Sequence, residues 1–143
     1  MRTVESTDGD RLLVRKASGD SLLVADPETG EERYVPRDDV SELDGASPLE
    51  TAAAGVPAAT RRVLTAVHDD ESLGLLVELV DRGPLAAVTL LDAYDYCESD
   101  LHGLLAELRA AGLVDDARVA GERGYDATAL AADGVANLRA TDD

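Results

Sequence analysis

The sequence has no phenylalanine and no tryptophan, and four tyrosines are its entire supply of aromatic side chains. Lysine is almost as scarce, because Lys16 is the single lysine among thirteen cationic residues. Hydrophobic residues still make up 45% of the chain, which excludes a disordered acidic tail and allows a packed core. That core must be built from leucine, valine and alanine.

Cationic residues are also few in total, since 13 Lys and Arg stand against 30 Asp and Glu, a net charge of −17. Carboxylates at this density repel one another in dilute buffer, and molar salt screens that repulsion to a Debye length of about 3 Å. An acid-rich, lysine-poor composition is favoured in a halophilic cytoplasm, and the alternative is an ordinary acidic domain. We therefore expect a cytoplasmic protein whose stability depends on salt.

The chain also lacks the usual signatures of membrane proteins and enzymes. It has neither a signal peptide nor an apolar run of about 18 residues, so we expect no membrane partner. A phosphate loop, a nucleophile elbow, a His-x-x-Glu-His run and a Cys-x-x-Cys pair are all absent, which predicts no enzyme and no cofactor. A metal site would require the fold to bring His68, His102 and Cys97 together, and we expect none.

The N-terminal part of the chain reads as β structure. Two copies of Asp-x-Leu-Leu-Val begin at Asp10 and Asp20 and predict a hairpin, with a third strand at 32–35. We therefore predict a three-stranded antiparallel β-meander in a first domain of residues 1–46, ending in a polar connector. Three strands bury too little to stand alone, so they must pack on helices or on a partner. A ligand-sensing role and a structural or dimerisation role both stay open.

Three helical patterns follow. Ser47, Pro48 and Glu50 form a capping start for the first pattern, which ends at Gly55. The second pattern begins at Pro57, and its predicted inward residues are Val63, Leu64 and Val67, with Arg61 and Arg62 outward. The third runs from Glu71 to Arg82, with a Glu78–Arg82 pair, and its predicted buried residues are Leu73, Leu76, Val77 and Val80.

A pair of short helices comes next. Residues 87–94 form the first, and residues 98–111 form the second, whose leucines follow helical spacing at 101, 104, 105 and 108. Gly112 ends the second helix where a left-handed residue is needed. Asp95 begins the short link between the helices, and aspartate tolerates the left-handed conformation such a turn uses. A helix-turn-helix is the predicted arrangement.

A hairpin and a last helix complete the chain. Strands at 115–120 and 125–127 flank a predicted turn at 121–124. Thr128 caps the last helix, whose predicted apolar positions are Leu130, Val135 and Leu138. Val135 and Leu138 have little nearby in sequence to cover them, so this helix and the 57–67 helix are the expected contacts if two copies of the chain pair.

Several positions along residues 57–140 match a known arrangement. The unit opens at Gly83-Pro84-Leu85, its first helix contains Leu90, and its second helix contains Leu101, Leu105 and Leu108. The chain then leads into the hairpin at Ala111-Gly112-Leu113-Val114, and Gly124-Tyr125 starts the return strand. The stretch resembles the winged helix-turn-helix superfamily of MarR-, ArsR- and TrmB-like prokaryotic regulators. The whole chain also resembles small winged-helix proteins of halophilic archaea. The resemblance implies an α+β winged-helix domain over residues 47–143, a homodimer, and double-stranded DNA as partner.

The resemblance also implies which residues face DNA. The side of the second helix opposite its leucines carries small residues, and in the superfamily that side enters the major groove. The implied DNA-binding residues are Ser99, His102, Gly103, Ala106, Arg109, Arg118, Arg123, Arg61 and Arg62. Residues 84–127 hold three arginines and nine acids, a balance of −6, which argues against phosphate binding. The alternative is therefore a winged-helix protein–protein module that does not bind DNA.

Cys97 lies near the start of the second helix of the pair, where a helix N-terminus lowers a thiol pKa. Asp95, Glu98 and Asp100 would raise that pKa again. A redox switch and a plain turn cysteine are both open interpretations.

Overall fold

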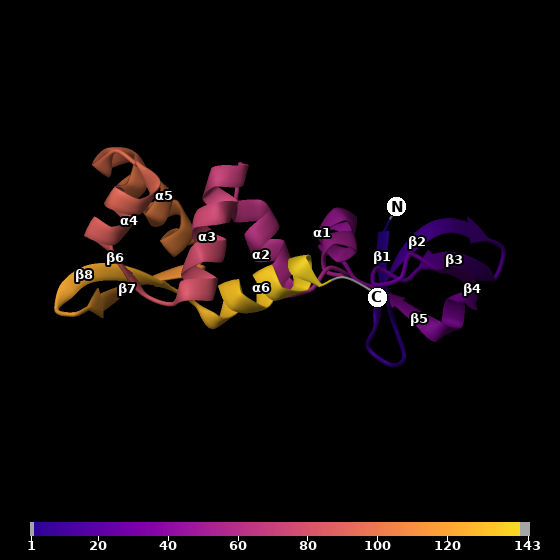
Figure 1. Ribbon diagram of the computed structural model, residues 1–143. Helices are drawn as coiled ribbons and strands as arrows, with labels where there is room; N and C mark the ends of the chain where they lie inside the picture. Colours follow the sequence, from indigo (N-terminus) through magenta and orange to yellow (C-terminus); the bar gives the residue numbers. More distant parts are fainter. Residues whose placement is uncertain (1, 141–143) are drawn as a thin grey trace. The chain divides into compact units, whose positions relative to one another are not determined.

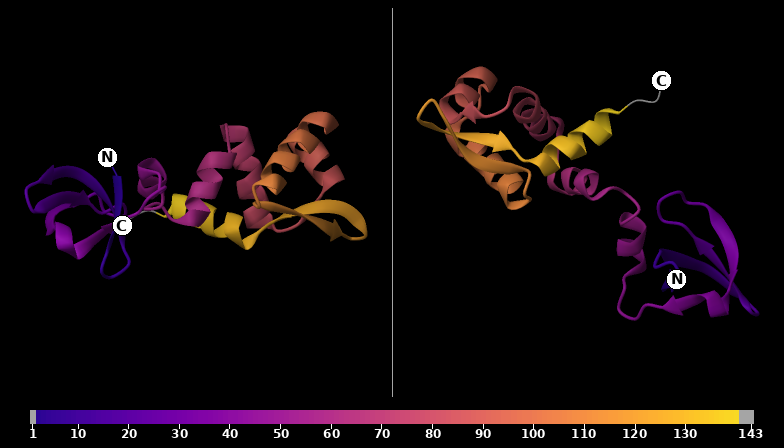
Figure 2. Two further views of the ribbon diagram at one scale, coloured as in Figure 1. Left: turned by 180° about the vertical axis from the view of Figure 1, so that it is seen from behind. Right: turned by 90° about the horizontal axis from the view of Figure 1, so that it is seen from below.

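A computed structural model describes residues 2–140, and the protein is an α+β protein that divides into two compact units after Pro57 (Figures 1 and 2). The expected boundary after residue 46 is too early. Helix α1 (Pro48–Ala53) packs on strands β1 and β2, so it belongs to the first unit. Each unit has its own sheet and its own core.

The sheet of the first unit has five antiparallel strands in the order β4-β3-β2-β1-β5. Its strands are β1 (Arg2–Ser6), β2 (Arg11–Ser18), β3 (Ser21–Ala25), β4 (Glu32–Pro36) and β5 (Val40–Glu42). The predicted three-stranded meander corresponds to β2, β3 and β4, but the predicted number of strands is too small, because β1 and β5 were not expected. A single turn of 3₁₀ helix, η1 (Arg37–Asp39), redirects the predicted connector so that β5 pairs with β1.

The first unit is closed by α1. Five side chains form its buried apolar cluster: Val4, Leu12, Val14, Leu22 and Val24. Ser47 caps α1 as predicted, and its hydroxyl accepts a hydrogen bond from the Glu50 N–H at 3.3 Å. The hydroxyls of Thr3 and Thr51 are buried and lie 2.8 Å apart, so a hydrogen bond ties α1 to β1. The cover that the sheet needs is thus supplied by this short helix.

The second unit alternates helices with a three-stranded antiparallel sheet of order β6-β8-β7. Its elements are α2 (Ala58–Ala66), α3 (Asp70–Arg82), β6 (Leu85–Ala86), α4 (Ala87–Tyr94), α5 (Glu98–Ala110), β7 (Val114–Val119), β8 (Glu122–Ala127) and α6 (Ala129–Arg139). The helices predicted at 87–94 and 98–111 are confirmed to within one residue.

Leucine dominates the core of the second unit. Leu101, Leu105 and Leu108 of α5 are buried as predicted, and they pack in one cluster with Leu76 and Leu90. The predicted buried face of α3 is partly wrong, because Leu75 and Leu79 are buried while Leu73, Val77 and Val80 are only partly covered. Helix α3 contacts both β8 and α6, so its buried surface is wider than one helical stripe. That surface is centred on Leu75, Leu76 and Leu79.

Helices α2 and α6 pack against each other within the chain. Val135 is buried there, and a side chain at Gly134 would lie only 2.6 Å from the Ala59 carbonyl oxygen. The helices expected to meet in a dimer are therefore already partners of each other. Leu64 is 58% exposed, so its predicted inward position is wrong, and Leu138, predicted as a dimer contact, is 44% exposed.

The end of α5 and the start of α6 meet at two residues. Gly112 is left-handed, with φ 78°, and the N–H of Leu113 donates to the Leu108 carbonyl at 2.9 Å, which closes α5 in a Schellman motif. The Thr128 hydroxyl donates to the Gly112 carbonyl at 2.8 Å and accepts from the Ala131 N–H at 3.2 Å. Thr128 therefore caps α6, as predicted, while holding the end of α5.

The tip of the β7–β8 hairpin is a two-residue loop. Ala120 and Gly121 both have positive φ, 51° and 82°, as a type I′ turn requires. The predicted tip at 121–124 is wrong, because Gly124 lies inside β8 and pairs with Ala86. A side chain at Gly124 would lie 2.5 Å from the Leu85 carbonyl oxygen, so glycine is required there for sheet packing and not for a turn.

Candidate functional site

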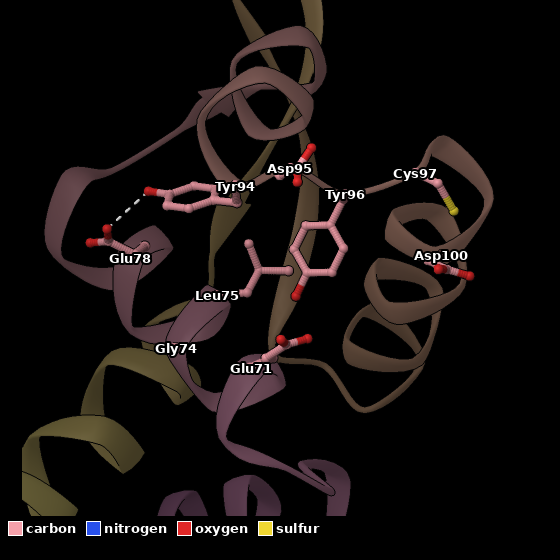
Figure 3. Close-up of a pocket in the computed structure, with 9 residues that line it drawn as sticks. All are labelled: Glu71, Gly74, Leu75, Glu78, Tyr94, Asp95, Tyr96, Cys97 and Asp100. Carbon is pink, nitrogen blue, oxygen red and sulfur yellow. Dashed lines mark hydrogen bonds between the residues drawn. The ribbon is translucent and has the colours of Figure 1, made fainter.

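The turn between α4 and α5 presents two tyrosines to α3. Asp95 is left-handed in this turn, with φ 54° and ψ 40°, as expected for the residue after α4. That conformation separates Tyr94 from Tyr96, and the two rings extend toward α3 on either side of Leu75 (Figure 3). Both rings are partly buried against the leucine core.

A hydrogen-bonded chain fixes the ring of Tyr94. Its hydroxyl accepts from the Arg82 Nη1 at 2.7 Å and donates to the Glu78 Oε1 at 2.9 Å. The predicted pair on α3 between Glu78 and Arg82 is thus bridged by a tyrosine of another helix. This arrangement links α4 to α3 and orients one wall of a cavity.

The cavity between α3 and the α4–α5 turn has a volume of about 490 Å³. Its lining combines the two tyrosines with carboxylates of Glu71, Asp95 and Asp100, and Glu78 lies at the Tyr94 end (Figure 3). Burial raises the pKa of the Tyr96 phenol, and the nearby carboxylates of Glu71 and Asp69 add to the shift. The phenol therefore stays neutral to a higher pH than a free tyrosine does.

A second cavity, of about 410 Å³, continues along α5 from the first. Tyr96, Glu71 and Asp100 line both cavities, and Ser99 and Gly103 of α5 line the second. Its other wall is the start of α3, which Asp69 caps by accepting from the Ser72 N–H at 2.8 Å. That hydrogen bond is the main reason why the pKa of Asp69 is lowered.

The outer side of α5 is exposed and acidic. Ser99, His102, Gly103 and Ala106 are all exposed, as the predicted DNA-facing side requires. The Nε2 of His102 lies 3.7 Å from the Glu98 Oε1, so its nearest charged neighbour is an acid. No heavy atom lies within 4 Å of the place where a side chain at Gly103 would begin.

The predicted arginines lie in two separate places. Arg118 and Arg123 are direct cross-strand partners near the hairpin tip, so their side chains emerge together on one face of the hairpin. Arg109 of α5 binds Asp116 of that hairpin, with Nη1 and Oδ1 2.8 Å apart.

Arg61 and Arg62 do not join this group. They lie on α2, at the end of the second unit opposite the hairpin tip (Figures 1 and 2). The fold therefore gathers three of the five predicted arginines around one hairpin and leaves the other two far away.

Sequence reasoning missed the tyrosine-lined cavity. Two of the four tyrosines lie within three residues of each other, on either side of Asp95, and this was the detectable signal. Their contact with Leu75 and Glu78 depends on how α3 crosses the turn, which no local pattern reveals.

Other site types receive no support from residues 2–140. No cluster of three or more His, Cys, Asp or Glu side chains there could hold a metal ion. Cys97 is exposed, and its Sγ lies 3.5 Å from the Ser99 hydroxyl, with no second cysteine in the chain. Across the same residues, every helix is too short or too polar to span a bilayer.

Comparison with known proteins gives a family and no function. No curated protein and no solved structure matches the chain. A family model matches residues 1–139, which include all of the first unit and nearly all of the second, and its description is a family of unknown function, DUF7346. Because this match covers almost the whole sequence, the chain belongs to the DUF7346 family.

Proposed function

We propose that the second unit is a winged helix-turn-helix domain and that the protein is a DNA-binding transcriptional regulator. The element order supports this proposal: α3, β6, α4, α5, β7, β8 and α6, with a three-stranded antiparallel sheet. In such a domain α5 is the recognition helix and the β7–β8 hairpin is the wing. The left-handed Asp95 fits the tight turn between the two helices.

The paired arginines at the hairpin tip carry the proposal. Like charges directly opposite each other on a sheet repel, so Arg118 and Arg123 are unfavourable neighbours unless an anion lies between or above them. The Arg118 guanidinium is held in place by donating to the Gly121 carbonyl at 3.3 Å. Guanidinium groups suit phosphate oxygens, and the tip is where a wing meets the DNA backbone.

The recognition helix contributes little charge to such a complex. Its exposed side carries Glu98, Asp100 and Glu107, and Arg109 is already neutralised by Asp116. Approach of α5 to phosphates is therefore opposed in dilute buffer, and molar salt limits that repulsion to about 3 Å. Small residues at Ser99, Gly103 and Ala106 leave room for close contact with base edges.

The test is the double variant Arg118→Ala with Arg123→Ala. Its affinity for mixed-sequence duplex DNA is measured by fluorescence anisotropy over a KCl series. We expect weaker binding to all sequences, and a slope of log affinity against log salt that is smaller by about 2, because two phosphate contacts are lost.

The matched control removes the same charge elsewhere, in Arg61→Ala with Arg62→Ala. We expect this variant to bind DNA nearly as the parent does, since α2 lies far from the hairpin tip. Equal losses in the two double variants would mean that only net charge matters, and the proposal of a DNA-contacting wing would then be wrong.

A protein–protein module that does not bind DNA is the second candidate, and the acidic lining along α5 favours it. Gly103→Leu separates the two candidates, because a large side chain at this open position obstructs either a groove wall or a partner surface. Loss of DNA affinity with unchanged oligomeric state supports the regulator. A parent without DNA affinity at any salt, whose self-association changes in Gly103→Leu, supports the interaction module.

We also propose a homodimer, since an inverted DNA site requires a two-fold protein. The exposed leucines Leu64 and Leu138, on α2 and α6, are among the apolar side chains available for it. Light scattering in about 2 M KCl, where carboxylate repulsion is screened, gives twice the chain mass if this is correct. A mass near 15.0 kDa would reject the dimer.

A further inference from the structure

The cavity between α3 and the α4–α5 turn has features that neither the core nor the proposed DNA contacts explain. Its volume of about 490 Å³ lies within the range of about 300–1,000 Å³ usual for small-molecule sites. Leu75 forms its apolar floor, and the rings of Tyr94 and Tyr96 stand on either side (Figure 3). The site is therefore a lined cavity with aromatic walls.

A glycine in the middle of α3 keeps this cavity open. Gly74 lines it, and no heavy atom lies within 4 Å of the place where a side chain would begin. A glycine inside a helix costs about 1 kcal/mol relative to alanine. Gly134 in α6 has a packing reason for that cost, because Ala59 and Val63 crowd it. Gly74 is exposed and not crowded in this way, so its missing side chain leaves this side of the cavity open to solvent.

The charges around the cavity have one sign. Glu71, Asp95 and Asp100 line it together with Glu78, and no Lys, Arg or His is among its lining residues in the described part of the chain. Arg82 donates to the Tyr94 hydroxyl at 2.7 Å, and this hydroxyl donates to Glu78, so a cation lies at the Glu78 end. The remaining carboxylates attract a cation from solution.

The spacing of these carboxylates selects the kind of cation. No three of the acidic, histidine or cysteine side chains in residues 2–140 converge on one point as metal ligands must. Separate carboxylates suit separate positive charges on one extended molecule. Tyrosine faces attract ammonium groups through their quadrupole, and Leu75 suits an aliphatic segment between those groups.

We propose that this cavity binds a small aliphatic cation with two or more ammonium groups, of the polyamine class. Its ammonium groups bind the carboxylates of Glu71 and Asp100 at one side and Asp95 at the other. The methylene segments lie over Leu75 and along the open face of Gly74, between the rings of Tyr94 and Tyr96. None of these residues lies on the hairpin, and Asp100 is the one that belongs to α5, the proposed recognition helix.

Spermidine is the probe for the test, added to the full-length protein in KCl buffer of constant ionic strength. The side-chain signals of Tyr94 and Tyr96 are followed by NMR, with Tyr34 and Tyr125 as internal references. We expect saturable single-site shifts of the two cavity tyrosines and none of the reference pair. In Glu71→Gln with Asp100→Asn the affinity should fall about tenfold or more, because two charge-assisted contacts are lost.

Two controls test the position of the site. Glu122→Gln with Asp133→Asn removes the same charge at exposed places outside the cavity, and its affinity should match that of the parent. Gly74→Leu fills the cavity and should abolish the shifts. If Gly74→Leu does not fold, Gly74→Ala decides, with a higher melting temperature and weaker binding expected together.

Three results would overturn the proposal. Unchanged binding in Gly74→Leu or Gly74→Ala would move the site elsewhere. Choline binding as tightly as spermidine would remove the role of a second ammonium group. Displacement of spermidine by Mg²⁺ at equal ionic strength would show a general counterion effect.

Discussion

The hairpin tip and the tyrosine-lined cavity belong to the same compact unit, yet they gather opposite charges. Two arginines stand side by side at the tip, whereas four acidic side chains and no cation line the cavity within the described chain. Helix α5 lies between them in sequence and borders both, through Arg109 at the hairpin and Asp100 at the cavity. Net charge alone therefore predicts neither region, because local placement separates acids from bases within a chain of charge −17.

Salt is expected to have the largest effect, because it screens the repulsion among the carboxylates and so raises the melting temperature. Between about 0.1 M and 2 M KCl the Debye length falls from about 10 Å to a few ångströms, and repulsion among surface carboxylates is suppressed. We expect the melting temperature of the protein to rise by more than about 10 °C, since a few kcal/mol correspond to that shift in domains of this size. Calorimetry over this range checks the prediction, and a flat melting temperature would contradict a halophilic adaptation.

Glycine replacements have the next largest effect, because an exposed mid-helix glycine lines each of the two cavities. Gly74→Ala beside the cavity and Gly103→Ala on α5 should each raise the free energy of unfolding by about 1 kcal/mol. Gly134→Ala should lower it by about 1–3 kcal/mol, since the added methyl would overlap the Ala59 carbonyl. Urea unfolding of the three variants measures this difference. A stabilised Gly134→Ala would contradict the packing described for α2 and α6.

Breaking the ion pair between Arg109 and Asp116 would make the hairpin region more positive and increase its difference from the acidic cavity. Asp116→Asn removes its ion-pair partner, and we expect DNA affinity to increase about two- to fivefold at low salt, as exposed ion pairs are worth up to about 1 kcal/mol. Asp115→Asn is the matched control, because its side chain points to the opposite face of β7. Equal gains in both variants would show that Arg109 has no special part.

The smallest expected effect is on the pH dependence of stability, through the carboxyl group of Asp69. The pKa of Asp69 is lowered from its ordinary value of 3.8, chiefly by the hydrogen bond from the Ser72 N–H. A carboxyl whose pKa is lower in the folded state adds stability above the unfolded pKa and loses it as pH falls through the folded value. Asp69→Asn should therefore be slightly less stable than the parent near neutral pH, and the difference should shrink on acidification below 3.8.

The control for this titration is Asp70→Asn, one residue later. Asp70 begins α3 but does not supply the cap, so its removal should leave a smaller pH-dependent difference. Urea unfolding of both variants from neutral to acidic pH gives the comparison. A difference for Asp69→Asn that grows on acidification would contradict the sign worked out from the lowered pKa.

Local patterns predicted much of the second unit correctly. Leucine spacing in α5, the left-handed Asp95 and Gly112, and the Thr128 cap each follow from interactions within a few residues of the chain. Such features depend on backbone conformation and on one buried face, and both are visible in sequence.

The errors arise where distant contacts decide the outcome. Strand β5 has one apolar residue, Val40, and it forms only because β1 offers an unpaired edge. Gly124 looks like turn material but is required by close contact with β6. The cavity was missed for the same reason, since Tyr94 and Glu78 meet only after α3 and α4 have packed.

The dual role of Thr128 has a mechanical consequence. The Thr128 hydroxyl caps the start of α6 and also donates a hydrogen bond to the Gly112 carbonyl at the end of α5. Rotation of one helix against the other at this junction therefore breaks a hydrogen bond. Helix α6 in turn packs closely on α2 at Gly134, against the Ala59 backbone and the Val63 side chain. We therefore expect a displacement of α5 to move α6 and α2 with it, and thereby the exposed side chains of Leu64 and Leu138.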